Sequence, residues 1–180
     1  MKKFLMTLAA VLCCAMTTTV FTACGDDDDK TPEEDNKAAA AVFKFNLKIG
    51  NDMLNALDLT VDYYDASGKL QSEAVTSGTW TKTVKASLPT TLGARLNIKL
   101  KGGVDPANIS VMNEDVIYSY DIKVLTASGK ELNEGKTDVV NKAYPVPGNK
   151  LADWVTKHAN DIVNCIYTVD LNGKCAVGSW

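Results

Sequence analysis

The sequence predicts a mainly β protein, an immunoglobulin-like antiparallel β-sandwich with one C-terminal helix. Segments of alternating apolar and polar side chains recur from residue 41 onward, as expected for strands with one buried face. Turn residues separate these segments about every ten positions, a spacing typical of sandwiches. A helical period replaces the alternation near the end of the chain. The alternative is an α+β fold in which this helix packs on a single antiparallel sheet.

The first half of the domain reads as a strand followed by a hairpin. Residues 41–49 alternate, and residues 50–52 are expected to break this strand. A second alternating run covers residues 57–64. Residues 65–68 follow it and include an aspartate and a glycine suited to a tight turn. Residues 69–75 would return as the second strand of the hairpin.

The middle of the chain contains three more alternating runs, at residues 80–88, 94–100 and 116–124. Pro89 is expected to end the first of these, because proline cannot donate to a strand ladder. The run at residues 116–124 should be the longest strand. A shorter, more polar segment near residues 131–140 is expected to pair with it.

One helix is predicted after two prolines. Asn149 is a suitable N-cap, and the apolar stripe has the spacing i, i+3, i+4, i+7, i+8 and i+11. Its members are Leu151, Trp154, Val155, His158, Ala159 and Ile162. Asn172-Gly173 then predicts a final hairpin with a two-residue turn.

That hairpin bears on the two cysteines of the domain. The two-residue turn would place Cys175 opposite Asp170, about 16 Å from Cys165 at roughly 3.3 Å per residue. A disulfide requires Cα atoms within about 7 Å. We therefore expect unbridged thiols, and a bend of the chain at Cys165 is the alternative.

The beginning of the chain predicts export. A cationic Met1-Lys2-Lys3 precedes an uncharged apolar segment at residues 4–20, and small residues lead to Cys24, the layout of a signal peptide covering residues 1–23. As a helix, the apolar segment would span only about 26 Å. A retained transmembrane anchor is the alternative.

Two motifs near Cys24 carry a resemblance. Phe21-Thr22-Ala23-Cys24 is similar to a bacterial lipobox, although Phe21 stands where Leu is usual. Gly25 follows, and then four aspartates: Asp26, Asp27, Asp28 and Asp29. Cys24 with this acidic run resembles the export signal of Bacteroidota-type surface-exposed outer-membrane lipoproteins. The resemblance covers about residues 1–30.

The resemblance implies a lipidated Cys24 in the outer membrane, with the domain on the extracellular side. Two or three acyl chains would anchor the protein stably. The alternatives are an ordinary signal peptide that leaves Cys24 as a thiol, and an acidic run that acts only as a solvated spacer. None of these motifs indicates what the domain does.

Charge separates the tether from the domain. Residues 24–40 form an acidic tether, and residues 41–180 form a single β-rich domain with fifteen acidic and fifteen basic side chains. A nucleic-acid partner is not expected, because no basic patch with interleaved aromatic residues occurs and Arg95 is the only arginine. Because the domain has equal numbers of acidic and basic side chains, the low isoelectric point of the chain, about 5.2, reflects the acidic tether.

No catalytic or metal-binding spacing stands out. The single histidine, His158, lies on the apolar helix stripe and is expected to pack. Zinc sites need several Cys or His ligands at short spacing, and phosphate sites need a glycine-rich loop. We expect no metal and no cofactor. A hydrolase with two facing carboxylates is a minor alternative, because fifteen domain acids leave many possible pairs.

Aromatic side chains are the candidate ligand-binding residues: Trp80, Tyr64, Tyr144 and Trp180. Their rings combine a flat apolar face with a polar group, and packing at the sandwich rim is the competing interpretation. The expected function is a non-catalytic surface binding module, accessory to an outer-membrane uptake system for a glycan or another polymer. The alternative is an adhesin or fimbria-associated subunit that acts through strand edges or other protein contacts.

Overall fold

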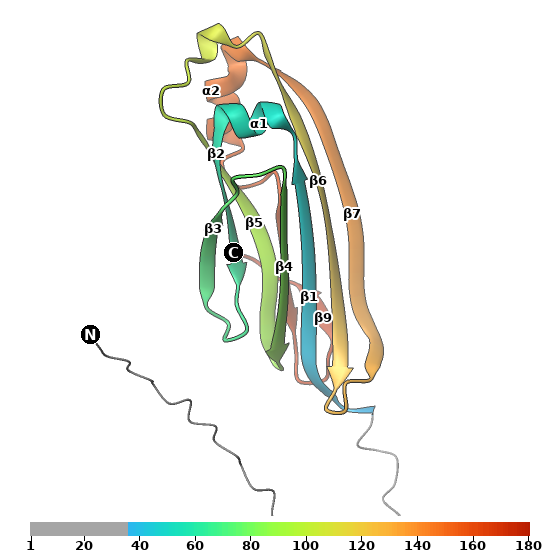
Figure 1. Ribbon diagram of the computed structural model, residues 1–180. Helices are drawn as coiled ribbons and strands as arrows, with labels where there is room; N and C mark the ends of the chain where they lie inside the picture. The colour runs from blue at the N-terminus through green and yellow to red at the C-terminus, as the bar shows by residue number, and fades with distance from the viewer. Residues whose placement is uncertain (1–35) are drawn as a thin grey trace, which may run out of the picture. The chain divides into compact units, whose positions relative to one another are not determined.

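The computed structural model describes residues 36–180, apart from the side chains at positions 133 and 134 (Figure 1). The predicted signal peptide (residues 1–23), the lipidation residue Cys24 and the aspartates at positions 26–29 lie outside the described residues. The described part is a mainly β sandwich of two antiparallel sheets, as predicted. The alternative with a single sheet is therefore wrong.

One sheet has four strands in the order β4-β1-β6-β7. Their bounds are Thr79–Ser87 for β4, Ala38–Ile49 for β1, Val111–Thr126 for β6 and Glu131–Pro147 for β7. Phe43 lies opposite Val84 on one side and Ile122 on the other. All three side chains are buried. The alternation along β1 therefore sets which face of the whole sheet points inward.

The other sheet has five strands in the order β3-β2-β5-β8-β9. Their bounds are Leu70–Ala74 for β3, Leu57–Tyr64 for β2, Thr90–Leu100 for β5, Asn164–Val169 for β8 and Cys175–Val177 for β9. Most inward positions of the alternating runs in β2 and β5 are buried, including Leu59, Val61 and Leu96, whereas Leu100 at the end of β5 is half-buried. They pack against the four-stranded sheet to form one core.

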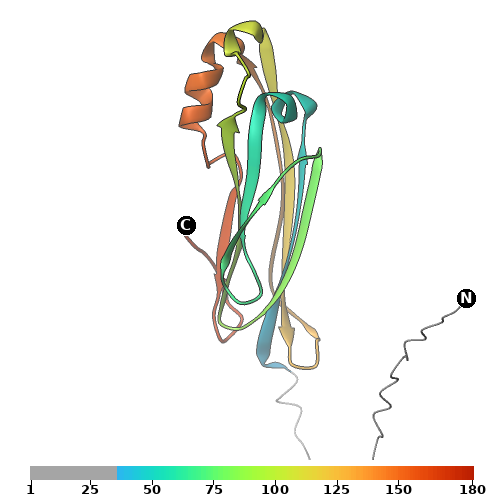
Figure 2. The ribbon, with the colours of Figure 1, turned by 60° about the vertical axis from the view of Figure 1, so that its left-hand side comes forward.

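Three short helices lie at one end of the sandwich: α1 (Asn51–Ala56), the 3-10 helix η2 (Pro106–Asn108) and α2 (Gly148–Lys157) (Figures 1 and 2). The sequence predicted only one helix, and α1 was expected to be a break. A six-residue helix is too short to show a helical period. It forms because Met53 and Ala56 are buried in the core. No helix in the described part is long and apolar enough to cross a membrane.

Helix α2 begins one residue before the predicted cap, at Gly148, and Pro147 takes the N-cap position. A side chain at Gly148 would place Cβ about 1.7 Å from the carbonyl oxygen of Ile109, so only glycine allows α2 to approach η2 this closely. The helix ends at Lys157, and His158 caps it. Ile162 is buried in the following turn.

Strand β7 differs most from the prediction. It continues through Pro145 and Pro147 and is the longest of the described strands, at 17 residues. Prolines are tolerated at a sheet edge when their nitrogens face away from the neighbouring strand, and β7 is the edge of its sheet. At Val139, the backbone N–H donates to the Asp138 carboxylate (2.7 Å). These features blunt the free edge of β7.

Three hairpin turns of one design lie at the end opposite the helices, at residues 65–69, 126–130 and 170–174. In each turn the fourth residue is a glycine with a positive φ: Gly68 (74°), Gly129 (89°) and Gly173 (83°). The first residue also accepts a side-chain hydrogen bond from the backbone N–H of the fifth. The first described residue, Asn36, lies at this end, where its side-chain oxygen accepts a hydrogen bond from Lys130 (3.1 Å).

The last of these turns corrects the predicted final hairpin. Cys175 pairs with Val169 and not with Asp170, because the Asp170 side chain organises a longer connection by accepting from the backbone N–H groups of Asn172 and Lys174. Cys165 and Cys175 are not bridged, as predicted. The Cys165 thiol is buried and donates to the carbonyl of Ala94 (3.5 Å).

Candidate functional site

The sandwich has two flanks, where an edge of one sheet faces an edge of the other. The closed flank lies between β3 and β4. The open flank lies between β7 and the segment that runs from the end of α2 through β8 to β9. The four predicted ligand-binding aromatics are divided between these flanks and the outer face of the five-stranded sheet.

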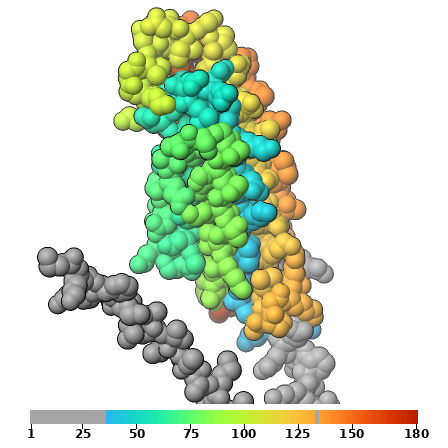
Figure 3. Space-filling model, in the orientation of Figure 1, coloured from blue at the N-terminus to red at the C-terminus, as the bar shows by residue number. Residues whose placement is uncertain are grey.

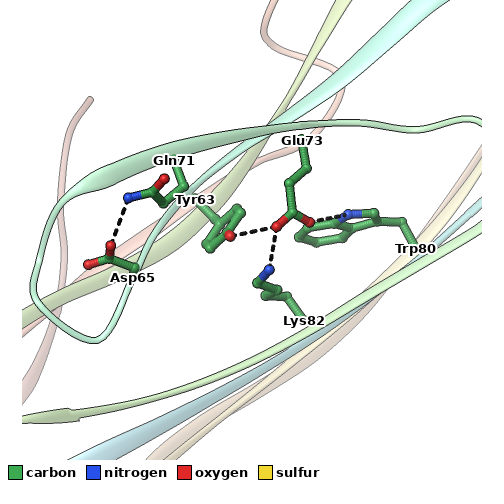
Figure 4. A network of polar contacts seen from close by, with 6 residues as sticks. All are labelled: Tyr63, Asp65, Gln71, Glu73, Trp80 and Lys82. Atoms are coloured by element: carbon green, nitrogen blue, oxygen red, sulfur yellow. Dashed lines mark hydrogen bonds and ion pairs between the residues drawn. The ribbon is translucent and has the colours of Figure 1, made fainter. Parts of the chain in front are cut away.

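A hydrogen-bonded network fills the closed flank (Figure 4). The Glu73 carboxylate accepts from the Tyr63 hydroxyl (2.6 Å), the Trp80 indole N–H (3.1 Å) and the Lys82 ammonium (2.5 Å). The hydrogen bonds from Lys82 and Tyr63 lower the pKa of Glu73. In the space-filling view the side chains of β3 and β4 form a continuous surface (Figure 3). The polar groups of this flank therefore bind one another.

Trp80 belongs to this network. Its ring lies edge-on to Phe45, with centroids 6.0 Å apart, and is tilted against Tyr63 at 5.8 Å. The indole N–H is already donated to Glu73. Two aromatic contacts and one hydrogen bond give Trp80 a packing role at the rim of the core.

Tyr64 and Trp180 stack on each other, with centroids 5.2 Å apart and planes 19° apart. The Arg95 guanidinium lies 4.5 Å from the Trp180 ring centroid and donates to Asp62 (3.0 Å). Trp180 also donates to Asn164 (2.6 Å). The two rings are therefore already in contact with each other and with neighbouring side chains of the same sheet. The four predicted aromatic side chains do not form one coplanar row.

Tyr64 also lines a hollow of about 540 Å³ at the turn end of the sandwich, together with Pro89, Thr168 and other residues. Serine and threonine hydroxyls supply much of its polar lining. The one carboxylate there, Asp170, is engaged by backbone N–H groups of its own turn. This hollow is large but carries no polar side chain placed to hold a ligand by charge.

The open flank contains the fourth predicted aromatic, Tyr144, in a hollow of about 460 Å³. We call it the Glu114 hollow. Glu114 on β6 and Tyr144 on β7 are direct partners in the ladder, so their side chains lie on the same face of the sheet. Lys142 adds an ammonium from β7, and His158 and Asp161 line the side formed by the chain after α2.

Glu114 is the most unusual polar group of this hollow. The residue is 9% exposed and makes no hydrogen bond within the described residues. Burial raises the pKa of Glu114, the charges of Lys142 and His158 act in the lowering direction, and Asp161 adds to the rise. The carboxyl oxygens of Glu114 open into the hollow, because Nε of Arg95 is the only buried side-chain nitrogen or oxygen without a hydrogen-bond partner in the described residues. A carboxyl with a shifted pKa that faces a hollow is a candidate functional group.

His158 is held at the edge of the same hollow. Its Nδ1 lies 2.9 Å from an oxygen of Asp161, and its ring is tilted against Trp154 with centroids 5.3 Å apart. The expected packing role of His158 thus includes an ion pair when the ring is protonated. In the described part of the chain, no serine, threonine or cysteine side chain lines this hollow, so the histidine has no hydroxyl or thiol nucleophile beside it.

A second hollow, of about 240 Å³, follows along β7 and is lined by Tyr118, Tyr120, Tyr167 and Asp138. We call it the tyrosine hollow. The hydroxyls of Tyr120 and Tyr167 are 2.5 Å apart. Burial, and then this hydrogen bond, raise the pKa of Tyr120.

A further hollow of about 440 Å³ lies at the helical end, lined by Asp52, Asp105, Met112 and other residues. Both aspartates are engaged. Asp52 accepts from the backbone and side chain of Asn113, and Asp105 accepts from Ala107 and Asn108 in the η2 turn. Among residues 36–180, no group of three or more His, Cys, Asp or Glu side chains could hold a metal ion.

Sequence reasoning found Tyr144 and missed its neighbours Glu114 and Lys142. A signal for Glu114 was present: it lies two residues before the predicted run at residues 116–124 and continues the same inward alternation in β6, between Met112 and Val116, which are both buried. A charged residue at an inward strand position is unusual unless it has a role. No comparable signal marked Lys142, whose segment was not expected to be strand.

Comparison with known proteins gives no match to a family model, a curated protein or a solved structure. The geometry of the open flank is therefore the basis for a functional proposal.

Proposed function

We propose that the chain is a non-catalytic, lipid-anchored binding module of the outer-membrane surface, accessory to an uptake system, and that it holds a glycan or another polymer along its open flank. The observation that carries the proposal is the succession of the Glu114 hollow and the tyrosine hollow along β7. Two adjoining hollows suit an extended ligand with repeating units better than a single small molecule.

The lining of these hollows supports a polyhydroxylated ligand. Tyrosine rings give flat apolar contact and hydroxyl groups at the same place. Glu114, Asp138 and Asp161 accept hydrogen bonds, whereas Lys142 and His158 can donate them. Three carboxylates, one ammonium and one imidazole offer both acceptors and donors, which favours a ligand that can donate and accept hydrogen bonds.

The position of the hollows along the sandwich supports a surface role. The chain enters β1 at the turn end, whereas the Glu114 hollow lies near the helical end, where Ile49 pairs with Val116. A strand of 12 residues spans about 40 Å. With Cys24 lipidated, the Glu114 hollow would lie about one strand length from the point where the tether joins the domain.

One observation favours the alternative of an adhesin or fimbria-associated subunit. Strand β4 is the other edge of the four-stranded sheet, nine residues long and without proline. Its free backbone groups could pair with a strand from a partner. Lys82 and Lys85 place charges on this edge, a common protection against such pairing, so the open flank remains the preferred site.

The function can be tested on cells that produce the full chain. Fluorescent uncharged and acidic polysaccharides should bind these cells, and a Tyr144→Ala/Tyr167→Ala double variant should lose that binding. Tyr64→Ala, which alters the stacked pair on the sheet surface, is the matched control and should bind normally. Equal binding by all three, or none by the parent chain, would contradict the proposal.

Lipidation and surface exposure can be tested separately. Cys24→Ala should abolish fatty-acid labelling and leave the protein in the inner membrane, while the parent chain should be cleaved by protease added to intact cells. A Cys24→Ala chain that is still labelled with fatty acid would contradict the lipoprotein assignment. A labelled parent chain protected from protease would contradict surface exposure only.

A further inference from the structure

We propose that the Glu114 hollow is a subsite for one uncharged sugar ring, whose hydroxyl groups connect the Glu114 carboxyl with the Lys142 ammonium while Tyr144 contacts the ring face. The inference rests on the proposed function and specifies its ligand class. It follows from three features of the hollow: an unpartnered carboxyl, an unpartnered ammonium and an exposed aromatic ring.

Glu114 supplies the acceptor. It is 9% exposed, lines the hollow and makes no hydrogen bond within residues 36–180. Its oxygens open into the hollow and are not occupied by another side chain or a backbone N–H of the described residues. The carboxyl is therefore available to accept a hydrogen bond from a ligand hydroxyl group.

Lys142 supplies the donor. It lines the same hollow and influences the pKa of Glu114 through its charge. However, the two groups do not form an ion pair, and Lys142 makes no hydrogen bond within the described residues. A hydroxyl group can donate to Glu114 while accepting from Lys142, which makes it the simplest group able to satisfy both.

The balance of charge argues against a charged ligand group. A cationic group bound to Glu114 would lie beside Lys142, and an anionic group bound to Lys142 would lie beside Glu114 and Asp161. Each would therefore meet a like charge in a partly desolvated site. An uncharged hydroxyl-bearing ring meets neither.

Tyr144 supplies the face. It is 60% exposed, it lies directly opposite Glu114 across the ladder, and it is two residues from Lys142 on the same face of β7. Cross-strand neighbours have Cβ atoms about 5 Å apart, and alternate residues of a strand are about 7 Å apart. The acceptor, the donor and the aromatic face are thus spaced for one sugar ring.

The test uses the full chain purified in detergent and electrophoresed through gels that contain one polysaccharide each. The probes are dextran, mannan and xylan as uncharged polymers, polygalacturonate as an anionic polymer and chitosan as a cationic one. At least one uncharged polymer should retard the chain. Glu114→Leu and Tyr144→Ala should each weaken that retardation about tenfold, the loss expected for one charge-assisted hydrogen bond or one ring contact.

Two control variants keep the result interpretable. Glu114→Gln retains a carbonyl acceptor and should bind within about threefold of the parent chain, since it can still accept from a hydroxyl. Tyr64→Ala removes an aromatic ring far from the hollow and should bind like the parent. Thermal unfolding of each variant shows whether weaker binding comes from a loss of fold.

The outcomes separate the inference from the proposed function. Retardation by an uncharged polymer that survives Glu114→Leu and Tyr144→Ala but is lost with Tyr167→Ala overturns the subsite and leaves the polymer-binding function. Retardation only by polygalacturonate or chitosan overturns the choice of an uncharged ring. No retardation by any polymer, together with no binding on cells, overturns both.

Discussion

Each flank of the sandwich contains a glutamate, and the two glutamates differ in hydrogen bonding and exposure. On the closed flank, Glu73 accepts three hydrogen bonds although its side chain is 41% exposed. On the open flank, Glu114 is 9% exposed and accepts none within the described residues. The first carboxylate serves the fold, whereas the second is left available. This difference, more than the number of aromatic rings, distinguishes a structural rim from a candidate binding site.

The largest expected effect compares the aromatic residues of the two flanks. Trp80→Ala should lower the free energy of unfolding by about 3 kcal/mol, because it removes a ring packed against Phe45 and Tyr63. Tyr144→Ala should change it by less than about 0.5 kcal/mol, because that ring is mostly exposed. Urea denaturation measures both. Equal losses would mean that Tyr144 is also a packing residue.

The second comparison exchanges each glutamate for leucine, a side chain of similar size. Glu114→Leu should raise the free energy of unfolding by about 0.5–1 kcal/mol, because it replaces a partly desolvated carboxyl that makes no hydrogen bond in the described residues with an apolar side chain. Glu73→Leu should lower it by about 1 kcal/mol, a value reduced for the exposure of that network. A destabilised Glu114→Leu would show that Glu114 is satisfied in the free protein.

The smallest expected effect is a difference in pH dependence. The pKa of Glu73 is lowered by the hydrogen bonds from Lys82 and Tyr63, so its contribution to stability is present above the ordinary pKa of 4.5 and is lost as the pH falls. The pKa of Glu114 is raised by burial, so the folded protein retains a proton that the unfolded chain releases, and stability falls as the pH rises above 4.5.

Glutamine variants isolate these contributions. Relative to the parent chain, Glu73→Gln should flatten the stability profile below about pH 4.5, and Glu114→Gln should flatten it above that value. Denaturation curves recorded from about pH 3 to about pH 8 give the profiles. If both variants changed the same pH range, the contrast between the two flanks would be lost.

Local alternation was enough to predict most of the sandwich. Leu59, Val61 and Leu96 are buried as their positions in alternating runs require. The sheet order could not be predicted in this way, because it depends on which strands meet across long connections. β1, for example, pairs with both β4 and β6, and nothing within residues 41–49 identifies those partners.

The errors have physical causes of two kinds. Helix α1 is too short for its period to appear. The strand was expected only near residues 131–140, but β7 is an edge strand that tolerates proline and continues to Pro147. The second error also affected the prediction of the candidate site, because Lys142 and Tyr144 lie on the part of β7 that was not predicted to be a strand. Only Tyr144 was selected, and it was selected for its ring alone.

The central position of β1 has a mechanical consequence. The chain enters β1 at the turn end, while the Glu114 hollow is built on β6 and β7 near the other end. A polymer held there and pulled away from an anchored tether would drag β1 and β6 past each other lengthwise. Because ladder hydrogen bonds lie across the strands, such a force would load the whole β1–β6 ladder together instead of opening it one pair at a time. With β4 paired along the other side of β1, the domain is arranged to resist sliding between the start of β1 and the proposed binding site.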